Sequence, residues 1–416
     1  ALHTLRFEDI ARAARHIRGA VRTTPCLRSA PLSEMVGADV WVKQEQCHYT
    51  GSFKERGARY ALSQMAKKFE GNEKFKGVIA ASAGNHALAL SWHAPQLNLP
   101  VTVIMPEVAP LAKIGRCRSL GANVVVHGAH ILEAFEHSQT PEYEGWEYLN
   151  GFDHPDIIAG AGTLGLEIDE QVDDIDYVIV PVGGAGLIAG VAAALDTVRP
   201  SAQVLGVEPE RCASYQAALT AGHPVDTPTR PTLADGLAVP KVGANAFEVS
   251  KDIVKQTVSV DERAIAIAML RLVEAEKTVI EGGGAVGLAS ILPGGPLHQK
   301  VQGKRVVLPL CGGNIDTTVL GRVLDRGLAA DGRLVKFSAS ISDRPGGIMR
   351  LSTVIAQNGA SIRDILHERA WEHTAIDLVR IQCTLETTNA EHAEKVRSAL
   401  AEHVGPQNLA WQSTSK

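Results

Sequence analysis

The sequence predicts an α/β fold built on parallel sheets, and two features of the chain indicate it. Short apolar runs alternate with amphipathic helical stretches from about Val40 to Leu324, a pattern typical of parallel strands buried on both faces. Several of these runs lead into a helix through a turn that contains glycine or serine. Ligands of such sheets bind beyond the carboxyl ends of the strands, so these turns are where a site is expected.

Seven apolar runs are the strands expected in this region: ADVWVK, GVIAAS, VTVIMP, NVVVHG, DYVIVPVG, QVLGVEP and RVVLPLCGG. The stretch before them, ALHTLRFEDIARAARHIRG, has the pattern of an amphipathic helix and not of a signal peptide. The segment PGGPLHQKVQGK reads as a loop and GLAADGR as a linker, because glycine, proline and polar residues dominate them.

The pattern changes after Arg333, where strands and helices follow in the order β-α-β-β-α-β of a ferredoxin-like unit. Its strands are LVKFSASI, ASIRDILHER, TAIDLVRIQCTLET and a weak last one near NLAWQS, and its helices are RPGGIMRLSTVIAQNG and NAEHAEKVRSALAEH. A chain of 416 residues is too long for one domain of ordinary size. We therefore expect a main region of residues 1–330, with a smaller lobe at roughly 50–155, and a small domain of residues 331–416.

Composition limits the classes of function. The hydrophobic fraction of 45% and the charged fraction of 21% are those of a globular protein. A formal net charge of -5 offers no basic footprint for nucleic acid, and no apolar run reaches the length that spans a membrane. The six cysteines are scattered without a CxxC pair, which speaks against a disulfide framework or a structural zinc site and favours a reduced, cytoplasmic location.

Lys54, in YTGSFKERGARYAL, stands at the expected start of a helix. A lysine there is commonly a solvated surface cation. A reactive amine requires partial removal from water so that its neutral form is accessible, and the neighbouring Phe53 supplies apolar surface for that. The sequence leaves both alternatives open for this residue alone.

Two turns between a strand and a helix are candidate anion sites. In SAGNHALAL the turn runs from Ser82 to His86, and the helix start offers unpaired N–H groups to a carboxylate. In VPVGGAGLIAG, Gly183, Gly184 and Gly186 allow backbone N–H groups to converge on a phosphate. The alternatives are a plain Ser or Asn helix cap and a glycine turn that only packs a helix on a strand.

A third strand end carries Cys311 in LPLCGGN, where the alternative is a small buried apolar residue. The second turn has neither the GxGxxG spacing nor a Walker lysine, so dinucleotides and nucleoside triphosphates are not favoured. Taken together, an amine, an anion-binding helix start, a glycine cradle and a polar strand end indicate one small phosphorylated aldehyde, pyridoxal phosphate.

Five segments carry a family resemblance: GSFKERGA, ASAGNHA, VGGAGL, TLADGLAV and CGGN, in this order. They resemble the serine/threonine dehydratases (threonine ammonia-lyases) of the tryptophan-synthase-β-like pyridoxal-phosphate family, which has fold type II with two open parallel-sheet lobes. The resemblance extends from about Phe7 to Arg326. The tail, with DRPGGIMRLSTVIAQNGASI, resembles an ACT regulatory domain.

The resemblance implies a role for each matching position. Lys54 would bind the cofactor aldehyde covalently and then remove the substrate α-proton, while Phe53 would lie against the cofactor ring. Asn85 would donate to the ring's 3'-oxygen, and Cys311 would face the pyridine nitrogen. The backbone of one turn would hold the phosphate: Gly183, Gly184, Ala185, Gly186 and Leu187. The other turn would surround the substrate carboxylate: Ser82, Ala83, Asn85 and His86.

The activity implied is β-elimination from L-threonine to 2-oxobutyrate, or from L-serine to pyruvate, with release of ammonia. Four alternatives stay open: another β-hydroxy amino acid as substrate, a β-replacement enzyme such as a cysteine synthase, a serine racemase, and an amino-acid-binding regulator without turnover. Ala83 stands where racemases of the family carry a second serine, which favours a lyase over a racemase. Leu88 departs from the glutamine usual at its position and leaves the polarity of the pocket open.

Further implications concern ions, regulation and assembly. Glu208 matches one ligand of a divalent cation in related racemases, but Ser214 stands near a position where they carry Asp. No residue is therefore assigned as a metal ligand, and whether a cation binds stays open. Glu281 matches an acidic residue near the active site, with a solvent-facing helix cap as the alternative. In the tail, Asp343, Arg344 and Gly346 are candidates for binding an amino-acid effector. Alternatively that unit only mediates oligomerisation, and a homodimer or homotetramer is expected.

Overall fold

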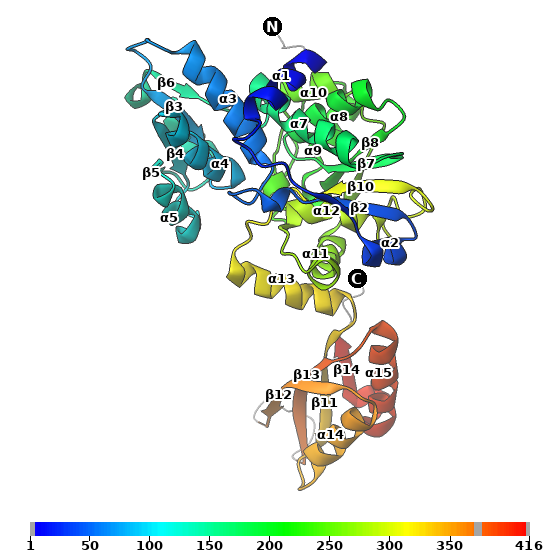
Figure 1. Ribbon diagram of the computed structural model, residues 1–416. Helices are drawn as coiled ribbons and strands as arrows, with labels where there is room; N and C mark the ends of the chain where they lie inside the picture. The colour runs from blue at the N-terminus through cyan, green and yellow to red at the C-terminus, as the bar shows by residue number, and fades with distance from the viewer. Residues whose placement is uncertain (1–4, 370–376, 413–416) are drawn as a thin grey trace. The chain divides into compact units, whose positions relative to one another are not determined.

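The computed structural model describes residues 5–369 and 377–412 and divides into two compact units, Ala1–Ile315 and Asp316–Lys416. Figure 1 shows the chain coloured from its N-terminus to its C-terminus. In the described part of the chain, no helix combines the length and the apolar character needed to cross a bilayer.

The larger lobe of the first unit is built on a six-stranded sheet of order β1-β2-β10-β7-β8-β9. Strand β1 is antiparallel to β2 and every other neighbouring pair is parallel. The strands span, in chain order, Cys26–Arg28, Asp39–Lys43, Tyr177–Pro181, Gln203–Pro209, Gln256–Val260 and Arg305–Pro309. Because the central strands are parallel, their carboxyl ends meet at one edge of the sheet.

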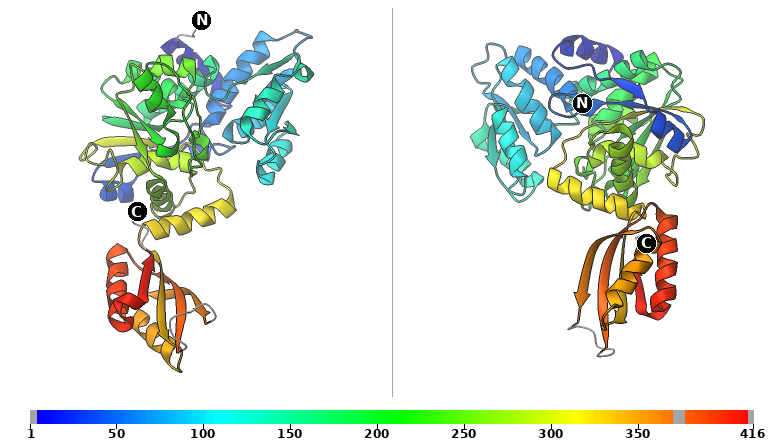
Figure 2. Two further views of the ribbon diagram at one scale, coloured as in Figure 1. Left: turned by 180° about the vertical axis from the view of Figure 1, so that it is seen from behind. Right: turned by 60° about the horizontal axis from the view of Figure 1, so that its bottom comes forward.

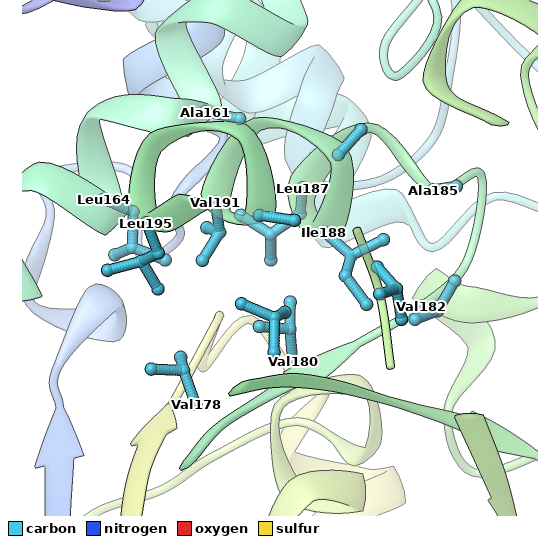
Figure 3. Packing of buried hydrophobic residues seen from close by; sticks show 14 of the residues in the cluster. Ala161, Leu164, Val178, Val180, Val182, Ala185, Leu187, Ile188, Val191 and Leu195 are labelled. Carbon is cyan, nitrogen blue, oxygen red and sulfur yellow. The ribbon is translucent and has the colours of Figure 1, made fainter. Parts of the chain in front are cut away.

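Helices cover both faces of this sheet (Figure 1), as expected for parallel strands that are apolar on both sides. On one face, Val178 and Val180 of β7 pack against Ile188 and Val191 of helix α8 (Figure 3). On the other face, an added Cβ at Gly287 of α12 would lie 3.4 Å from the carbonyl oxygen of Ile179. The helices of this lobe are α1 (Phe7–Ile17), α2 (Ala30–Val36), α7 (Pro155–Gln171), α8 (Gly186–Val198), α9 (Ser214–Ala221), α10 (Ala244–Ser250), α11 (Glu262–Glu276) and α12 (Gly282–Ile291).

The smaller lobe has a four-stranded parallel sheet of order β5-β4-β3-β6 with its own apolar core. Its strands are β3 (Gly77–Ala81), β4 (Val101–Met105), β5 (Asn123–Val126) and β6 (Trp146–Tyr148). Its helices are α3 (Lys54–Lys68), α4 (Asn85–His93), α5 (Leu111–Ser119) and α6 (Ile131–Ser138).

The second unit contains a four-stranded antiparallel sheet of order β12-β13-β11-β14. Figure 2 shows helices α14 and α15 on one side of this sheet. The side chains of β11 alternate between core and outside, with Val335, Phe337, Ala339 and Ile341 buried. The elements are α13 (Thr317–Ala330), β11 (Leu334–Ser342), α14 (Gly347–Gln357), β12 (Ser361–Glu368), β13 (Leu378–Glu386), α15 (Ala390–Val404) and β14 (Leu409–Gln412).

Short 3-10 helices complete the element list at Glu45–Cys47, Pro95–Leu97, Pro141–Tyr143, Glu210–Cys212, Asp235–Leu237 and Pro406–Asn408. The seven predicted strands of the main region are confirmed as β2, β3, β4, β5, β7, β8 and β10, and the order β-α-β-β-α-β of the tail is also observed. The prediction that GLAADGR is a linker is wrong, because α13 continues through Ala330. The predicted strands of the tail also include residues 374–376 and Ser413, which lie outside the described residues.

Candidate active site

The segment that carries Lys54 is fixed to the carboxyl end of strand β10. The backbone N–H of Phe53 donates to the carbonyl oxygen of Cys311 at 3.0 Å, and Ser52 forms an antiparallel bridge with Gly312. Gly51 has a φ of 79°, and a Cβ there would lie 2.6 Å from Oδ1 of Asn314. Lys54 therefore begins α3 at the edge of the large sheet where a ligand is expected.

Lys54 is half-buried, and its Nζ donates to the carbonyl oxygen of Gly151 at 2.5 Å. The same nitrogen lies 5.1 Å from the centre of the Phe53 ring. Burial lowers the pKa of Lys54 from 10.5 to about 8, although the nearby carboxylate of Glu281 acts to raise it. The alternative of a solvated surface cation is thus wrong.

Cys311 lies just beyond β10 with its thiol almost fully buried. The Sγ atom donates to the carbonyl oxygen of Pro309 at 3.4 Å. Burial raises the pKa of the Cys311 thiol well above its ordinary value. The group is therefore an uncharged thiol at neutral pH.

Asn85, the first residue of α4, lies between two polar side chains. Its Nδ2 donates to Oε1 of Glu281 at 2.6 Å, and its Oδ1 accepts from Nδ2 of Asn314 at 2.8 Å. Burial raises the pKa of Glu281 to about 7, assisted by the charge of Asp235. Because Glu281 is half-buried and its side chain does not cap α12, the alternative of a solvent-facing cap is wrong.

His86 is buried beside Lys54, and its Nε2 lies 3.0 Å from the carbonyl oxygen of Leu149. Within the described residues its Nδ1 has no hydrogen-bond partner. Burial and the charge of Lys54 lower the pKa of His86 to about 3, so the ring is neutral. Because the Leu149 carbonyl oxygen can only accept, Nε2 of the neutral ring carries the proton, and the free Nδ1 can accept one hydrogen bond from a ligand.

Ser82 and Ala83 lie in the turn between β3 and α4. The Ser82 hydroxyl accepts from the backbone N–H of Gly84 at 3.3 Å, while α4 begins without a side-chain cap. The alternative of a plain Ser or Asn cap is therefore wrong for this turn. Ala83 packs against the core of the smaller lobe.

The glycine turn after β7 is crowded by other backbone and by an aromatic ring. A Cβ on Gly184 would lie 2.3 Å from the ring of Phe152, and one on Gly186 would lie 2.2 Å from the Phe152 carbonyl oxygen. Ala185 has a φ of 70° and precedes the first turn of α8. Helix starts leave backbone N–H groups such as those of Gly186 and Leu187 without a helical acceptor. The turn therefore packs closely against Phe152 and also offers the backbone N–H groups of Gly186 and Leu187 to an anion.

A buried charge network lies behind Lys54 at the base of α3. Arg56 donates to both carboxylate oxygens of Glu45 at 2.7 and 2.8 Å, and to both of Glu167 at 2.7 and 2.8 Å. Lys43 donates to Oε2 of Glu167 at 2.6 Å. Such a network fixes the direction of α3 because an unpaired charge at this depth is costly.

The residues matched to a cation site, Glu208 and Ser214, lie in β8 and at the start of α9. The Glu208 carboxylate accepts from the backbone N–H groups of Tyr215 and Gln216 at 2.7 and 3.0 Å, and burial raises the pKa of Glu208 to about 7. Ser214 is buried and offers a hydroxyl in place of a carboxylate. Across residues 5–369 and 377–412, no group of three or more His, Cys, Asp or Glu side chains is arranged to hold a metal ion.

A cavity of about 330 Å³ adjoins the Asn85 network. Asn314 and Gly51 form one part of its wall and Leu88 another. Leu88 is buried, so the leucine that stands in place of the family's usual glutamine makes this wall apolar.

Sequence reasoning missed several residues that complete the site. The segment LNGFD, residues 149–153, supplies the acceptors for His86 and Lys54 and the ring at the glycine turn. Asn314 was within reach of prediction, because it belongs to the quoted motif CGGN. The contacts of Leu149 and Gly151 are made by backbone carbonyl oxygens, and these cannot be predicted from a pattern of side chains.

Comparison with known proteins gives consistent results. Residues 17–312 match the family model described as "Pyridoxal-phosphate dependent enzyme". The chain is 39% identical over 394 residues to an L-threonine ammonia-lyase of Thermotoga maritima, covering 94% of this chain and 96% of that protein. It is 38% identical over 395 residues to an L-threonine ammonia-lyase of Geobacter sulfurreducens, covering 94% and 96%.

Among solved structures, the processed form of threonine deaminase isoform 2 from Solanum lycopersicum is similar with a TM-score of 0.71 and 31% identity. The similarity covers 78% of this chain and 97% of the threonine deaminase chain. Serine racemase from Dictyostelium discoideum is similar with a TM-score of 0.69 and 32% identity, covering 76% and 100%.

Proposed function

Since the chain belongs to the family of pyridoxal-phosphate dependent enzymes, we propose that it deaminates L-threonine and L-serine by β-elimination, releasing 2-oxobutyrate or pyruvate and ammonia. The observation that carries this proposal is a half-buried Lys54 amine with a lowered pKa at the carboxyl edge of the large sheet. Relatives that share almost the full length of the chain support the choice of threonine.

The residues of the site fit the cofactor. Lys54 offers an amine to an aldehyde, and the turn of Gly183, Gly184, Ala185, Gly186 and Leu187 would hold a phosphate with its backbone N–H groups. A side chain at Gly184 or Gly186 would collide with Phe152, so the turn keeps its backbone bare. Phe53 and Asn85 would flank the cofactor ring, and Cys311 would face its nitrogen.

Bound pyridoxal phosphate supplies an electron sink for the negative charge that develops at the substrate α-carbon. Lys54 removes the α-proton, and its pKa of about 8 leaves a useful fraction of the amine neutral near pH 7. Cys311, as an uncharged thiol, places no negative charge beside the ring nitrogen. The start of α4, with Ser82, Ala83, Asn85 and His86, would bind the substrate carboxylate through its unpaired N–H groups.

The other activities of the fold are less well supported. A racemase requires an acid-base group on the opposite face of the substrate, and Ala83 has no hydroxyl to supply one. A regulator without turnover has no need of a Lys54 amine with a lowered pKa. β-Replacement and dehydration of a different β-hydroxy amino acid are distinguished by substrate tests.

The test is an oxo-acid assay on the purified holoenzyme with L-threonine, L-serine and other β-hydroxy amino acids, in parallel with K54A. We expect oxo acid from L-threonine without an added nucleophile and none from K54A. Formation of D-serine as the main product from L-serine would instead indicate a racemase. Product only in the presence of a thiol nucleophile would indicate β-replacement.

We also propose that residues 1–330 form the catalytic region and that residues 331–416 form an ACT-like regulatory domain. Asp343, Arg344 and Gly346 would bind an amino-acid effector in the turn before α14. Gly346 has a φ of 93°, which bends the backbone of this turn sharply. Asp343 accepts from Nε of Arg369 at 2.9 Å, so the turn also carries charged groups that could bind an amino acid. Titration of the full chain with branched-chain amino acids, followed by calorimetry and by sedimentation for a dimer or tetramer, tests this proposal. An Asp343→Asn variant that binds the effector as the unchanged chain does would contradict the assignment.

A cytoplasmic location is part of the same proposal. All six cysteines are free thiols, which supports a reducing compartment. Fractionation of cells with an antibody to the chain tests it.

A further inference from the structure

The segment 149–153, here called the strap, connects β6 of the smaller lobe to α7 of the larger one. Its first half faces the reactive residues: the carbonyl oxygen of Leu149 lies 3.0 Å from Nε2 of His86, and that of Gly151 accepts from Nζ of Lys54 at 2.5 Å. The Asn150 side chain accepts from the backbone N–H groups of Phe152 and Asp153 at 2.9 and 2.8 Å. The strap is therefore a tight turn with its carbonyl groups aimed at the site.

Its second half is fixed to the larger lobe. The Asp153 carboxylate accepts from the backbone N–H groups of Ala244 and Ala246 at 3.1 and 3.0 Å, and the Asp153 carbonyl oxygen accepts from Nδ2 of Asn245 at 3.0 Å. These donors belong to the first turn of α10, which lies 91 residues away in the chain. A charged acceptor shared by two N–H groups at a helix start is a strong local anchor.

The same helix start also fixes the glycine turn. The backbone N–H of Gly243 donates to the carbonyl oxygen of Gly184 at 3.1 Å. A Cβ on Gly243 would lie 2.2 Å from Oδ1 of Asp153, so the strap and the start of α10 leave no room for a side chain at position 243. Phe152, next to Asp153, fills the space beside Gly184 and Gly186. The start of α10 thus joins the strap and the glycine turn at one point.

We propose that Asp153 is a positioning residue: by holding the strap on the start of α10, it sets the Gly151 carbonyl against the Lys54 amine and Phe152 against the glycine turn. This inference rests on the proposed function, since it concerns the geometry in which Lys54 and the glycine turn bind pyridoxal phosphate together. Asp153 itself touches neither Lys54 nor the turn amides through any described contact of its side chain. A displacement of the strap misplaces both ends of the site at once.

The test compares D153N with D261N in the full chain. In D153N the new amide keeps one accepting oxygen and points its NH2 group at a backbone N–H, which is also a donor. Asp261 is the matched control, because its carboxylate accepts from the backbone N–H of Ala264 at the start of α11. We expect D153N to raise the Kd of the apoprotein for pyridoxal phosphate by roughly tenfold, and D261N to change it by less than about twofold. Thermal unfolding of both apoproteins separates this effect from a general loss of stability.

A244P provides a second variant that preserves the helix. Proline is favoured at the first helical position, and the change removes only one of the two backbone donors to Asp153. We expect it to raise the Kd by roughly threefold. Equal affinities of D153N, A244P and D261N would overturn the inference. Failure of the unchanged chain to bind pyridoxal phosphate would instead overturn the proposed function.

Discussion

At the scale of single residues, burial drives four groups of the site toward their uncharged forms. It lowers the pKa of Lys54 to about 8 and that of His86 to about 3, and it raises the pKa of Glu281 to about 7 and that of Cys311 well above its ordinary value. Taking a group out of water always disfavours its charged form. The neutral form of the Lys54 amine is therefore more accessible than it would be in an exposed lysine.

The lowered pKa of Lys54 predicts how cofactor attachment depends on pH. Only the neutral amine attacks an aldehyde. The rate at which the apoprotein attaches pyridoxal phosphate should rise with pH and reach half of its plateau value near pH 8. Stopped-flow absorbance between about pH 6 and 10 measures this rate. A rate that is still rising steeply at about pH 10, as the ordinary lysine pKa of 10.5 would give, would contradict a buried amine.

Glu281 predicts a pH dependence of stability in the apoprotein. Its pKa is 4.5 in its ordinary state and about 7 in the folded chain, so the folded chain binds more protons between these values. Its contribution to the free energy of unfolding therefore falls as pH rises from about 4.5 to 7. E281Q should make this decline shallower in urea unfolding series, whereas E70Q, at an exposed position, should not. Parallel declines for E281Q and the unchanged chain would refute this assignment.

At the scale of elements, the apolar strands were predictable and the short ones were not. Seven runs rich in apolar residues became strands, because most of their consecutive residues are apolar, as burial on both faces requires. β1 and β6 have three residues each, too few for any periodicity. β9 is half-exposed at the sheet edge, so QTVSV carries no apolar run.

The glycine turn predicts the effect of a single methyl group. In G184A the new Cβ would collide with the Phe152 ring, so we expect a loss of about 1–3 kcal/mol in the free energy of unfolding and weaker binding of pyridoxal phosphate. Urea unfolding and spectroscopic titration measure the two effects. The matched control is G115A in α5, where nothing lies within 4 Å of the new Cβ and alanine favours the helix. Equal stability of G184A and G115A would contradict the crowding of the turn.

At the scale of the whole molecule, the two units have separate cores. The buried cluster of the second unit includes Phe337, Leu351, Ile381 and Val396, all of them from that unit. We expect residues 316–416, expressed alone, to unfold in one cooperative transition, measured by circular dichroism in urea. A gradual, non-cooperative change would show that this unit depends on the first.

The motifs of the candidate site could be predicted from the sequence, but the contacts between residues far apart in the chain could not. Asn85 follows β3 of the smaller sheet, and the glycine turn and Cys311 follow β7 and β10 of the larger sheet, so these motifs lie beyond the carboxyl ends of parallel strands. Lys54 begins α3, and the residue before it is fixed to the end of β10. The strap escaped prediction because its partners lie far away in sequence: Gly151 is 97 residues from Lys54, and Asp153 is 91 from Ala244. The charge network of Arg56 escaped for a similar reason, since Glu167 is 111 residues away.

The most direct measurement on the central claim is chemical trapping of the cofactor. The holoenzyme is treated with borohydride, digested, and its labelled peptide identified by mass spectrometry, with K54A as the control. We predict a single pyridoxyl label on Lys54, in the peptide that follows Phe53, and none in K54A. A label on another lysine, or none in the unchanged chain, would contradict the account.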